Sequence, residues 1–447
     1  MEDCKLPMDT LIDILARLPV KSLMRFKCVC KFFYSFIKNN RQFMDKHYEF
    51  RKGKSHCAVI EFEPESYDPD PEPLPNQVFY LIYKESESDD AECIYLDLPN
   101  SKTRFVKCCD GMLCLILCRG DLIRSDIVTI TSPEIIFDVL VLNPFTREVK
   151  VLPFIKVPDK SSPNRPRLKI QFGFGLSNNK TWKVIMLLSF EHPNWEIDSH
   201  EIVMVCSQVG DLWSWRQIDV ALDSLYLGSL IFDSRDFYFK GKYYWQSSKG
   251  HLVWFDIDDE IFGKIERPSN VKGLEFFTVM NESIVAVTMQ LPCTENEACT
   301  EIWVMNENNN NISWNKQKSI FSSRDMLEYF YPIGFWDPSG HLLVFSGHME
   351  IRYSNYYHDY NIDEELYFKD GFGPCLISID LETHERKTIF TSQERMSTLT
   401  IGLNPAGHVQ VCSERSGVTQ IQEWNDRNIR WEMGSYLRTF HESLKLL

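Results

Sequence analysis

The chain has 447 residues, too long for one compact helical bundle and long enough for a large β domain with an appendage. Apolar residues make up 44% and charged residues 25%, an ordinary globular composition that excludes a wholly disordered or collagen-like chain. The formal net charge of −15 argues against binding to nucleic acid or to an anionic membrane by bulk electrostatics.

The first five residues, Met-Glu-Asp-Cys-Lys, lack the charged and then apolar layout of a secretory signal peptide. No run of about 18 apolar residues, the length that spans a bilayer, follows anywhere in the chain. We therefore expect an intracellular protein located in the cytoplasm, with the nucleus as a further location. The 14 cysteines are scattered without a C-x-x-C pair, so we expect free thiols rather than disulfides or a zinc site.

Residues 6–48 have the apolar spacing of three short helices. The first begins after Pro7 and ends before Pro19, the second carries Leu23 and Phe26 on one side, and the third follows directly. So small a unit buries little surface by itself. Its apolar stripe therefore needs a partner, which is either another protein or the chain's own β domain.

Acid-rich stretches occur at 61–73, 84–92 and 358–365. In the first of them proline alternates with acid. Because proline and like charge disfavour a packed core, we expect loops in these stretches.

From about residue 103 one pattern recurs, in which an apolar strand ends at a polar anchor and a second strand brings Trp or Lys seven or eight residues later. The anchors lie 64, 49, 50 and 74 residues apart and are Asn143, Ser207, Asp256, Asn306 and Asp380. A period of about fifty residues predicts a β-propeller of about six blades, with seven as the alternative count. We expect strands near 57–62 and 78–83 to join strands near 398–412 and close the ring. Two stacked β-sandwiches are the competing architecture.

Two patterns are candidates for chemistry. Phe-Gly-Phe-Gly at 172–175 lacks the third glycine and the helix of a phosphate loop, so we interpret it as strands close to the propeller axis. The acids Asp256, Asp258, Asp259 and Glu260 suit either a calcium ion or an acid-rich hairpin turn, and we favour the turn. The histidines are unpaired in sequence, and no nucleophile elbow or P-loop occurs. The sequence therefore predicts no catalytic residue, no cofactor and no metal.

The helical segment resembles an F-box, through Leu-Pro at 6–7, Leu-Pro-Val-Lys-Ser-Leu at 18–23 and Arg-Phe-Lys-Cys-Val-Cys-Lys at 25–31. One departure is Phe33, which stands where many F-boxes carry Trp. The resemblance implies that residues 1–50 dock onto a Skp-type adaptor and, through it, a cullin. The expected adaptor-binding residues are Leu6, Pro7, Leu11, Ile12, Leu15, Leu18, Pro19, Leu23, Val29 and Cys30.

The remainder resembles the plant F-box-associated interaction domain, through Asp-Gly-Met-Leu-Cys-Leu at 110–115, Asn-Pro-Phe-Thr-Arg-Glu-Val at 143–149, Trp-Lys-Val-Ile at 182–185 and Glu-Ile-Trp-Val-Met at 301–305. With Ser-Tyr-Leu at 435–437 and Glu-Ser-Leu at 442–444, the chain is most similar to the S-locus F-box lineage. The resemblance implies acidic loops and the first propeller strands over 51–102, and a partner-recognition propeller over 103–447.

These resemblances imply a non-catalytic substrate-recognition subunit of an SCF-type ubiquitin ligase. The target implied by the S-locus lineage is a pistil S-ribonuclease in self-incompatibility, a class that tends to be basic. The acidic stretches would then steer the ribonuclease electrostatically, or alternatively only keep the propeller soluble. Two other functions stay open, namely a propeller enzyme that acts on sugars or small molecules and a structural or inhibitory binding protein outside the ligase. The sequence identifies no target-binding residue.

Overall fold

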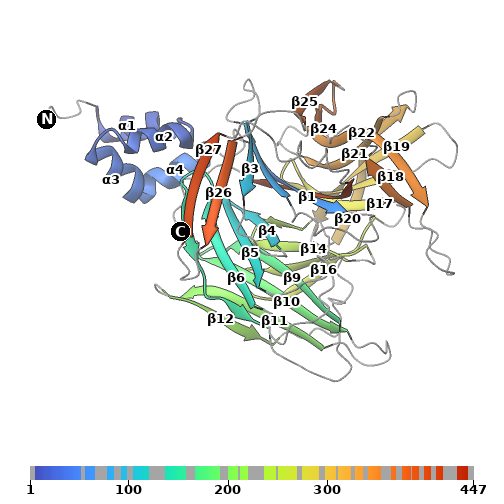
Figure 1. The fold of residues 1–447 in the computed structure, drawn as a ribbon, viewed down its shortest axis with the longest axis horizontal. Helices are drawn as coiled ribbons and strands as arrows, with labels where there is room; N and C mark the ends of the chain where they lie inside the picture. Colours follow the sequence, from blue (N-terminus) through green and yellow to red (C-terminus); the bar gives the residue numbers. More distant parts are fainter. Residues whose placement is uncertain are drawn as a thin grey trace.

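The computed structural model shows a small helical lobe at one side of a large all-β body (Figure 1). No helix among the described residues is long and apolar enough to cross a membrane. The residues that the structure describes are 6–51, 56–65, 78–84, 92–97, 104–119, 136–157, 167–191, 200–209, 212–219, 236–247, 250–268, 274–290, 297–308, 311–323, 328–335, 341–353, 364–368, 375–383, 385–391, 397–403, 409–415 and 430–440.

The helical lobe contains four helices, one more than the apolar spacing predicts. Their bounds are α1 Met8–Ala16, α2 Val20–Lys27, α3 Lys31–Asn39 and α4 Arg41–Arg51. Pro7 and Pro19 directly precede α1 and α2, where a missing N–H breaks no helical hydrogen bond. The additional helix α4 begins after Asn40, whose side-chain oxygen accepts a hydrogen bond from the backbone N–H of Phe43 at 3.0 Å. Asn40 is therefore the local signal for the start of α4, a signal that apolar spacing does not contain.

Four antiparallel sheets follow one another along the chain, and we number them blades 1 to 4. Blade 1 contains β4 Arg104–Cys109, β5 Met112–Arg119, β6 Ile136–Asn143, β7 Glu148–Val151 and β8 Ile155–Lys156. Blade 2 contains β9 Arg167–Leu176, β10 Trp182–Glu191, β11 His200–Val209 and β12 Leu212–Ile218. Blade 3 contains β13 Phe237–Phe239, β14 Lys242–Gln246, β15 Leu252–Asp256 and β16 Phe262–Ile265. Blade 4 contains β17 Leu274–Met280, β18 Ser283–Gln290, β19 Glu297–Asn308 and β20 Asn311–Ser323.

The fifth sheet has eleven strands and closes the ring. One part, which we call blade 5, contains β21 Glu328–Phe335, β22 Leu342–Tyr353, β24 Cys375–Ile379 and β25 Arg386–Thr391. The other part, the closing strands, joins both ends of the chain and contains β1 His56–Glu65, β2 Val78–Lys84, β3 Glu92–Asp97, β23 Glu364–Phe368, β26 Ser397–Leu403, β27 Val409–Arg415 and β28 Arg430–Phe440. The strands expected near 57–62, 78–83 and 398–412 do lie in one sheet, as β1, β2, β26 and β27. The direct connection is made by strands outside that expectation, since β3 pairs with β26 and β1 pairs with β28.

The β-propeller is confirmed and the sandwich alternative is excluded. In the part of the chain that the structure describes, the strands form five sheets, against about six expected blades. The difference arises from the length of β22. Its first half, 342–346, pairs with β24, and its second half, 349–353, pairs with β23 of the closing strands. One long strand therefore joins two sets of strands that the repeat pattern treats as separate blades.

The expectation of loops in the acidic stretches is wrong where those stretches overlap strands. Residues 61–65 belong to β1, Glu92 begins β3, and Glu364 begins β23. Strand β1 is held on both sides, by β2 and β28, and Glu65 lies opposite Arg430 in the register. The parts at 66–73, 85–91 and 358–363 lie outside the described residues.

The repeat anchors lie at or near the end of the third strand of each blade. Asn143 and Asp256 end β6 and β15, and Asp380 directly follows β24, whereas Ser207 and Asn306 lie two residues before the ends of β11 and β19. The side-chain oxygen of Asn143 accepts hydrogen bonds from the backbone N–H groups of Phe145 and Thr146 at 3.0 and 3.1 Å. Asp256 and Asp380 make the same two contacts to the residues two and three positions further on. A short polar side chain at the anchor therefore closes the turn into the fourth strand.

Apolar clusters fill the space between successive blades, and one side chain of each outer strand seals the cluster against the preceding blade. In each blade, this residue lies on the fourth strand and pairs with the third-strand residue that directly precedes the repeat anchor. The sealing residues, which lie at four successive interfaces from the closing strands to blade 4, are Val149, Trp215, Phe262 and Trp314. The indole N–H of Trp215 donates to the Pro153 carbonyl at 2.7 Å, and that of Trp314 donates to the Glu266 carbonyl at 2.9 Å. The recurring tryptophans Trp215 and Trp314 are therefore packing residues.

The two glycines of the Phe-Gly-Phe-Gly segment lie on β9, which contacts β4 and β13 at the centre of the ring. A Cβ atom at Gly173 would lie 2.7 Å from the Trp245 ring, and one at Gly175 would lie 2.8 Å from Ile257. The Trp245 indole donates a hydrogen bond to the backbone carbonyl of Phe172 at 3.1 Å. Glycine here permits close packing of blade 3 on blade 2, which confirms the structural interpretation of the segment.

A buried ion pair connects blades 1 and 3. The Lys107 ammonium on β4 contacts the carboxylate of Asp236, which directly precedes β13, and the two side chains are 3% and 0% exposed. Each charge has lost its hydration and depends on the other for compensation.

We expect Asp236→Ala to lower the free energy of unfolding by about 3–5 kcal/mol, because it leaves the Lys107 ammonium buried without its carboxylate. The double variant Lys107→Met with Asp236→Leu is the control and should recover most of the loss. Urea unfolding followed by tryptophan fluorescence measures both effects. Equal midpoints for the wild-type protein and Asp236→Ala would show that the pair contributes nothing.

Candidate functional site

The helical lobe has an apolar core of its own. Its buried side chains come from all four helices and are Leu11, Ile12, Leu15, Ala16, Val20, Leu23, Phe36, Ile37, Phe43 and Met44. The lobe therefore keeps its shape through internal packing, and only its outer side chains are available to a partner.

The structure divides the ten residues predicted to bind an adaptor into three groups. Leu6, Pro7, Val29 and Cys30 are exposed. Leu18 and Pro19 are half-buried at the turn between α1 and α2. The remaining four are buried in the core of the lobe, so they support the surface without forming it; they are Leu11, Ile12, Leu15 and Leu23.

Four exposed apolar side chains were absent from the predicted set: Met8, Ile14, Phe32 and Tyr34. Their exposed fractions lie between 43% and 50%. The exposure of Ile14 could have been predicted from helical spacing. Leu11 and Leu15 belong to the buried stripe of α1, and Ile14 lies outside that stripe. The exposure of Phe32 and Tyr34 is harder to predict from the sequence, because other aromatic residues of the same helix α3, such as Phe36, are buried.

The lobe is attached to one rim of the propeller, where tight turns connect the strands of blades 1 and 2. The Tyr48 hydroxyl donates to the Asp110 carboxylate at 2.7 Å, and the Lys180 ammonium contacts Asp45 at 2.8 Å. Phe145, in the turn after the Asn143 anchor, packs against both the lobe core and the cluster beneath blade 1. Burial, followed by the charge of Asp110, raises the pKa of Tyr48, so this hydroxyl stays a donor. The lobe is therefore held in one orientation by polar and apolar contacts together.

A buried histidine connects α4 to the turn between α1 and α2. The Nε2 atom of His47 lies 2.9 Å from the backbone carbonyl of Leu18. The His47 side chain is fully buried, and burial lowers its pKa to about 4 in spite of the hydrogen bond to Leu18. His47 is therefore neutral at physiological pH and fixes the turn that carries Leu18 and Pro19.

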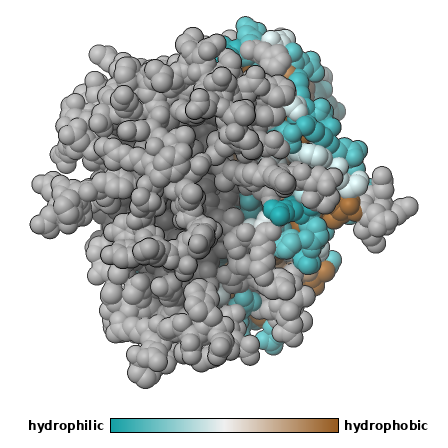
Figure 2. Space-filling model, turned by 90° about the vertical axis from the view of Figure 1, so that its right-hand side faces the viewer, coloured by the Kyte–Doolittle hydropathy of each residue, from teal (hydrophilic) through white to brown (hydrophobic). Residues whose placement is uncertain are grey.

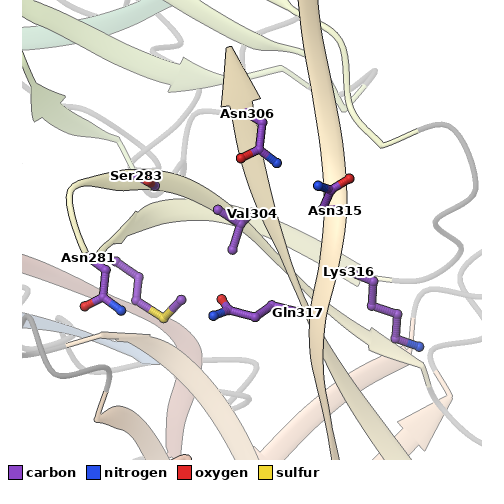
Figure 3. A pocket seen from close by; sticks show the side chains of 8 residues that line it. Asn281, Ser283, Val304, Asn306, Asn315, Lys316 and Gln317 are labelled. Carbon is purple, nitrogen blue, oxygen red and sulfur yellow. The ribbon is translucent and has the colours of Figure 1, made fainter. Parts of the chain in front are cut away.

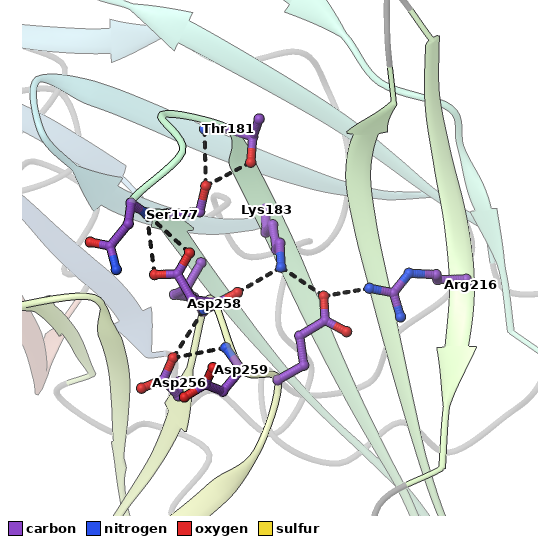
Figure 4. Close-up of polar contacts among 10 residues, drawn as sticks. Ser177, Thr181, Lys183, Arg216, Asp256, Asp258 and Asp259 are labelled. Atoms are coloured by element: carbon purple, nitrogen blue, oxygen red, sulfur yellow. Dashed lines mark hydrogen bonds and ion pairs between the residues drawn. The ribbon is translucent and has the colours of Figure 1, made fainter.

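Of the four acids that suited either a calcium ion or a hairpin turn, the carboxylates of Asp256, Asp258 and Glu260 are engaged by the protein itself. The side chain of Asp256 accepts from the backbone N–H groups of Asp258 and Asp259, and the Asp258 carboxylate accepts from the backbone N–H of Asn178 at 3.1 Å (Figure 4). Within the part of the chain that the structure describes, no group of three or more His, Cys, Asp or Glu could hold a metal ion. The hairpin interpretation is confirmed.

The fourth acid, Glu260, joins blade 3 to blade 2. Its carboxylate lies 2.7 Å from the Lys183 ammonium and also contacts the Arg216 guanidinium (Figure 4). Partial burial opposes ionisation of this carboxyl, but the hydrogen bonds from Arg216 and Lys183 outweigh it and lower the pKa of Glu260. The cluster is thus a contact between blades.

Two family profiles match the chain. One, described as the F-box domain, matches residues 4–44, and the other, described as the F-box associated beta propeller domain, matches residues 85–371. The second match covers more than half of the sequence. The chain therefore belongs to the family of proteins with an F-box associated beta propeller domain, here preceded by an F-box domain.

Similar full sequences come from Arabidopsis thaliana. F-box protein At1g30790 is 26% identical over 213 residues, which is 48% of this chain and 49% of that protein. F-box protein At2g17830 is 24% identical over 372 residues, which is 76% of this chain and 82% of that protein. The chain thus spans about half of the first relative and most of the second. Among solved structures, TolB from Acinetobacter baumannii aligns with a TM-score of 0.33 and 9% identity over 78% of this chain and 69% of that one, a likeness too low to support an argument.

The depressed pKa of His47 predicts that the helical lobe loses stability in acid. The unfolded chain takes up this proton as the pH falls below about 6.5, whereas the folded lobe does so only near pH 4. Stability should therefore be full at pH 7 and fall between these two values, by about 3 kcal/mol at most. Amide hydrogen exchange of α1 and α4 at pH 7 and pH 5 measures the change, and His47→Leu should remove most of it. Equal protection at both pH values would contradict the assignment.

Proposed function

We propose that this chain is the substrate-recognition subunit of an SCF-type ubiquitin ligase. The F-box binds a Skp-type adaptor and, through it, a cullin, while the propeller holds a target protein. Ubiquitin transfer takes place on a separate conjugating enzyme. The chain contributes proximity, because a lysine of the captured target is held near the activated ubiquitin.

The observation that carries this proposal is the set of apolar side chains on the helical lobe that neither its own core nor the propeller covers. Their exposed fractions lie between 43% and 68%, and they are Leu6, Met8, Ile14, Val29, Phe32 and Tyr34. So many exposed apolar residues on one small unit are typical of a protein-binding surface. The contacts of Tyr48, Asp45 and Phe145 with the propeller involve a different part of the lobe and leave this surface available.

We expect Val29→Asp and Phe32→Asp each to weaken adaptor binding at least tenfold, because each places a charge in an apolar interface. Both residues are exposed, so the fold should be preserved. Leu18→Ala combined with Pro19→Ala should also remove most binding. Calorimetric titration with the purified adaptor measures the affinity, and circular dichroism checks the fold.

Leu212→Asp is the matched control, since Leu212 is an exposed apolar residue on the outer strand of blade 2. It should bind the adaptor as the wild-type protein does. A wild-type chain that never binds the adaptor would exclude the ligase function altogether.

We further propose that the target is a basic pistil ribonuclease, as the resemblance to the S-locus F-box lineage implies. The support is electrostatic, since the chain carries a net charge of −15 and acid-rich stretches. Opposite charge on the two proteins increases the rate of encounter more than it lengthens the life of the complex.

This second proposal predicts an association rate that falls steeply as ionic strength rises, with a much smaller change in the dissociation rate. Neutral replacements of six acids should reproduce much of that loss at low salt; the six are Glu61, Glu63, Glu65, Asp68, Asp70 and Glu72. Surface plasmon resonance with candidate ribonucleases at several salt concentrations separates the two rates. Salt-independent association would mean that charge does not select the target.

A further inference from the structure

The interface between blades 4 and 5 differs from the four interfaces that precede it. Near the axis it is filled in the same way, by an apolar cluster that includes Val285, Ile302, Leu342 and Ile379. Because blades fan out from a common axis, the gap between them widens toward the outer strands. The other interfaces close this wider part with the sealing residues Val149, Trp215, Phe262 and Trp314.

At this interface the register places Arg386 of β25 in the position of the sealing residue. Arg386 pairs with Ile379, the residue before the Asp380 anchor, just as Trp314 pairs with Met305. Arg386 therefore shares the face of blade 5 that is turned toward blade 4. Its side chain is exposed, so it does not seal the gap with apolar surface.

A pocket of about 280 Å³ lies on blade 4, and its described lining comes from this blade alone (Figure 3). It is on the face turned toward blade 5, because Met280 and Val304 of the lining belong to the apolar cluster shared with blade 5. Its floor is apolar and comes from Met280 and Val304, and its walls carry four carboxamide side chains, those of Asn281, Asn306, Asn315 and Gln317. In the view of Figure 2, the coloured surface of described residues is mainly hydrophilic, with a few separate hydrophobic residues.

A β-bulge shapes one wall of the pocket. Strand β20 pairs regularly with β19 except at Gln317, since Ile302 pairs with Lys318 and Trp303 with Lys316. The extra residue has no partner position on β19, and its side chain is one of those that line the pocket (Figure 3). Bulges of this kind redirect a side chain and are frequent beside binding sites.

The chemistry of the pocket suits a neutral ligand that both donates and accepts hydrogen bonds. Carboxamides offer both functions at each position. The one charged residue among the described lining is Lys316, and its ammonium pairs with Glu301 at 2.5 Å, away from the carboxamides (Figure 3). Peptide groups and Asn, Gln, Ser or Thr side chains match this pattern.

The edge of blade 4 lies directly beside the pocket. In the sheet order β17-β18-β19-β20, the outermost strand β20 pairs with β19 on one side, and no described strand pairs with its other side. An exposed strand edge offers backbone N–H and C=O groups to an extended segment from another protein.

We propose that the cleft between blades 4 and 5 binds an extended peptide segment, which pairs with the edge of β20 and places a polar uncharged side chain in the carboxamide pocket. The inference rests on the proposed function, because the segment would belong to the captured target. Backbone pairing gives the affinity, and the carboxamides select the side chain.

The test uses the full chain bound to its adaptor and an array of synthetic octapeptides in an extended, Thr- and Val-rich frame, with the central residue varied. Peptides with central Asn, Gln, Ser or Thr should bind more tightly than those with Ala, Lys or Glu. Asn315→Ala and Gln317→Ala should each weaken binding at least tenfold. N-methylation of alternate peptide nitrogens, which removes strand-pairing donors, should abolish it.

Arg386→Trp is the sharpest variant, because it restores the apolar seal found at the other interfaces. It should abolish peptide binding while leaving the melting temperature unchanged or raised, which separates closure of the cleft from misfolding. The matched control is Gln217→Ala, which alters an exposed glutamine on β12, the equivalent outer strand of blade 2, and should bind normally.

Three outcomes would each overturn the inference. They are an array in which no peptide binds selectively, peptide affinities that Arg386→Trp leaves unchanged, and selective binding of neutral oligosaccharides instead of peptides. Adaptor affinity, measured on the same samples, keeps the two proposals apart. If the chain binds the adaptor but no peptide, only the proposed peptide site is excluded. A chain that binds no adaptor loses the ligase function.

Discussion

Blades 1 to 4 of this propeller each have two apolar faces, and each face packs against a neighbouring set of strands. The clusters around Phe172, Trp245 and Phe277 provide this packing near the axis, where small residues such as Gly173 let aromatic rings touch backbone. Farther out the blades diverge, and the sealing residues fill the widening gap. The ring holds together because this covering continues from blade to blade and because the two chain ends meet in the eleven-stranded sheet.

Ring closure also determines where the helical lobe lies. Helix α4 ends at Arg51 and β1 begins at His56, so the lobe is tied to the closing strands by a short connection. Contacts such as Tyr48 with Asp110 and Phe145 with the lobe core then hold it against the rim of tight turns. A rigid attachment of this kind suits a receptor that must present a target in a fixed direction, because proximity accelerates transfer only when the geometry is maintained.

The packing of each blade against its neighbour also explains why the interface between blades 4 and 5 is the one proposed to bind a target. Where an apolar sealing residue is present, the outer gap is closed and contributes to stability. Where Arg386 takes that position, no apolar side chain of the described outer strand β25 occupies it, and the neighbouring face of blade 4 carries a pocket with carboxamide side chains. In the proposed arrangement, stability and binding use different interfaces of one repeated architecture, and both kinds of interface have an apolar cluster.

The sequence by itself determined the features that depend on neighbours along the chain. The anchors Asn143, Asp256 and Asp380 were identifiable because each bonds the backbone two and three residues later, and Pro7 and Pro19 marked helix starts for similarly local reasons. The F-box and propeller resemblances rest on such short strings, whereas α4, which depends on the Asn40 cap, was missed.

Only the tertiary structure decided which side chains are covered, because that depends on elements far apart in sequence. It placed Leu11, Ile12, Leu15 and Leu23 inside the lobe instead of at its surface. It paired Lys107 with Asp236 and merged two expected blades through β22. It also brought Asn281, Asn306 and Gln317 around one pocket, since the alignment of strands across a sheet and of blades around a ring is set by long-range pairing that no local pattern encodes.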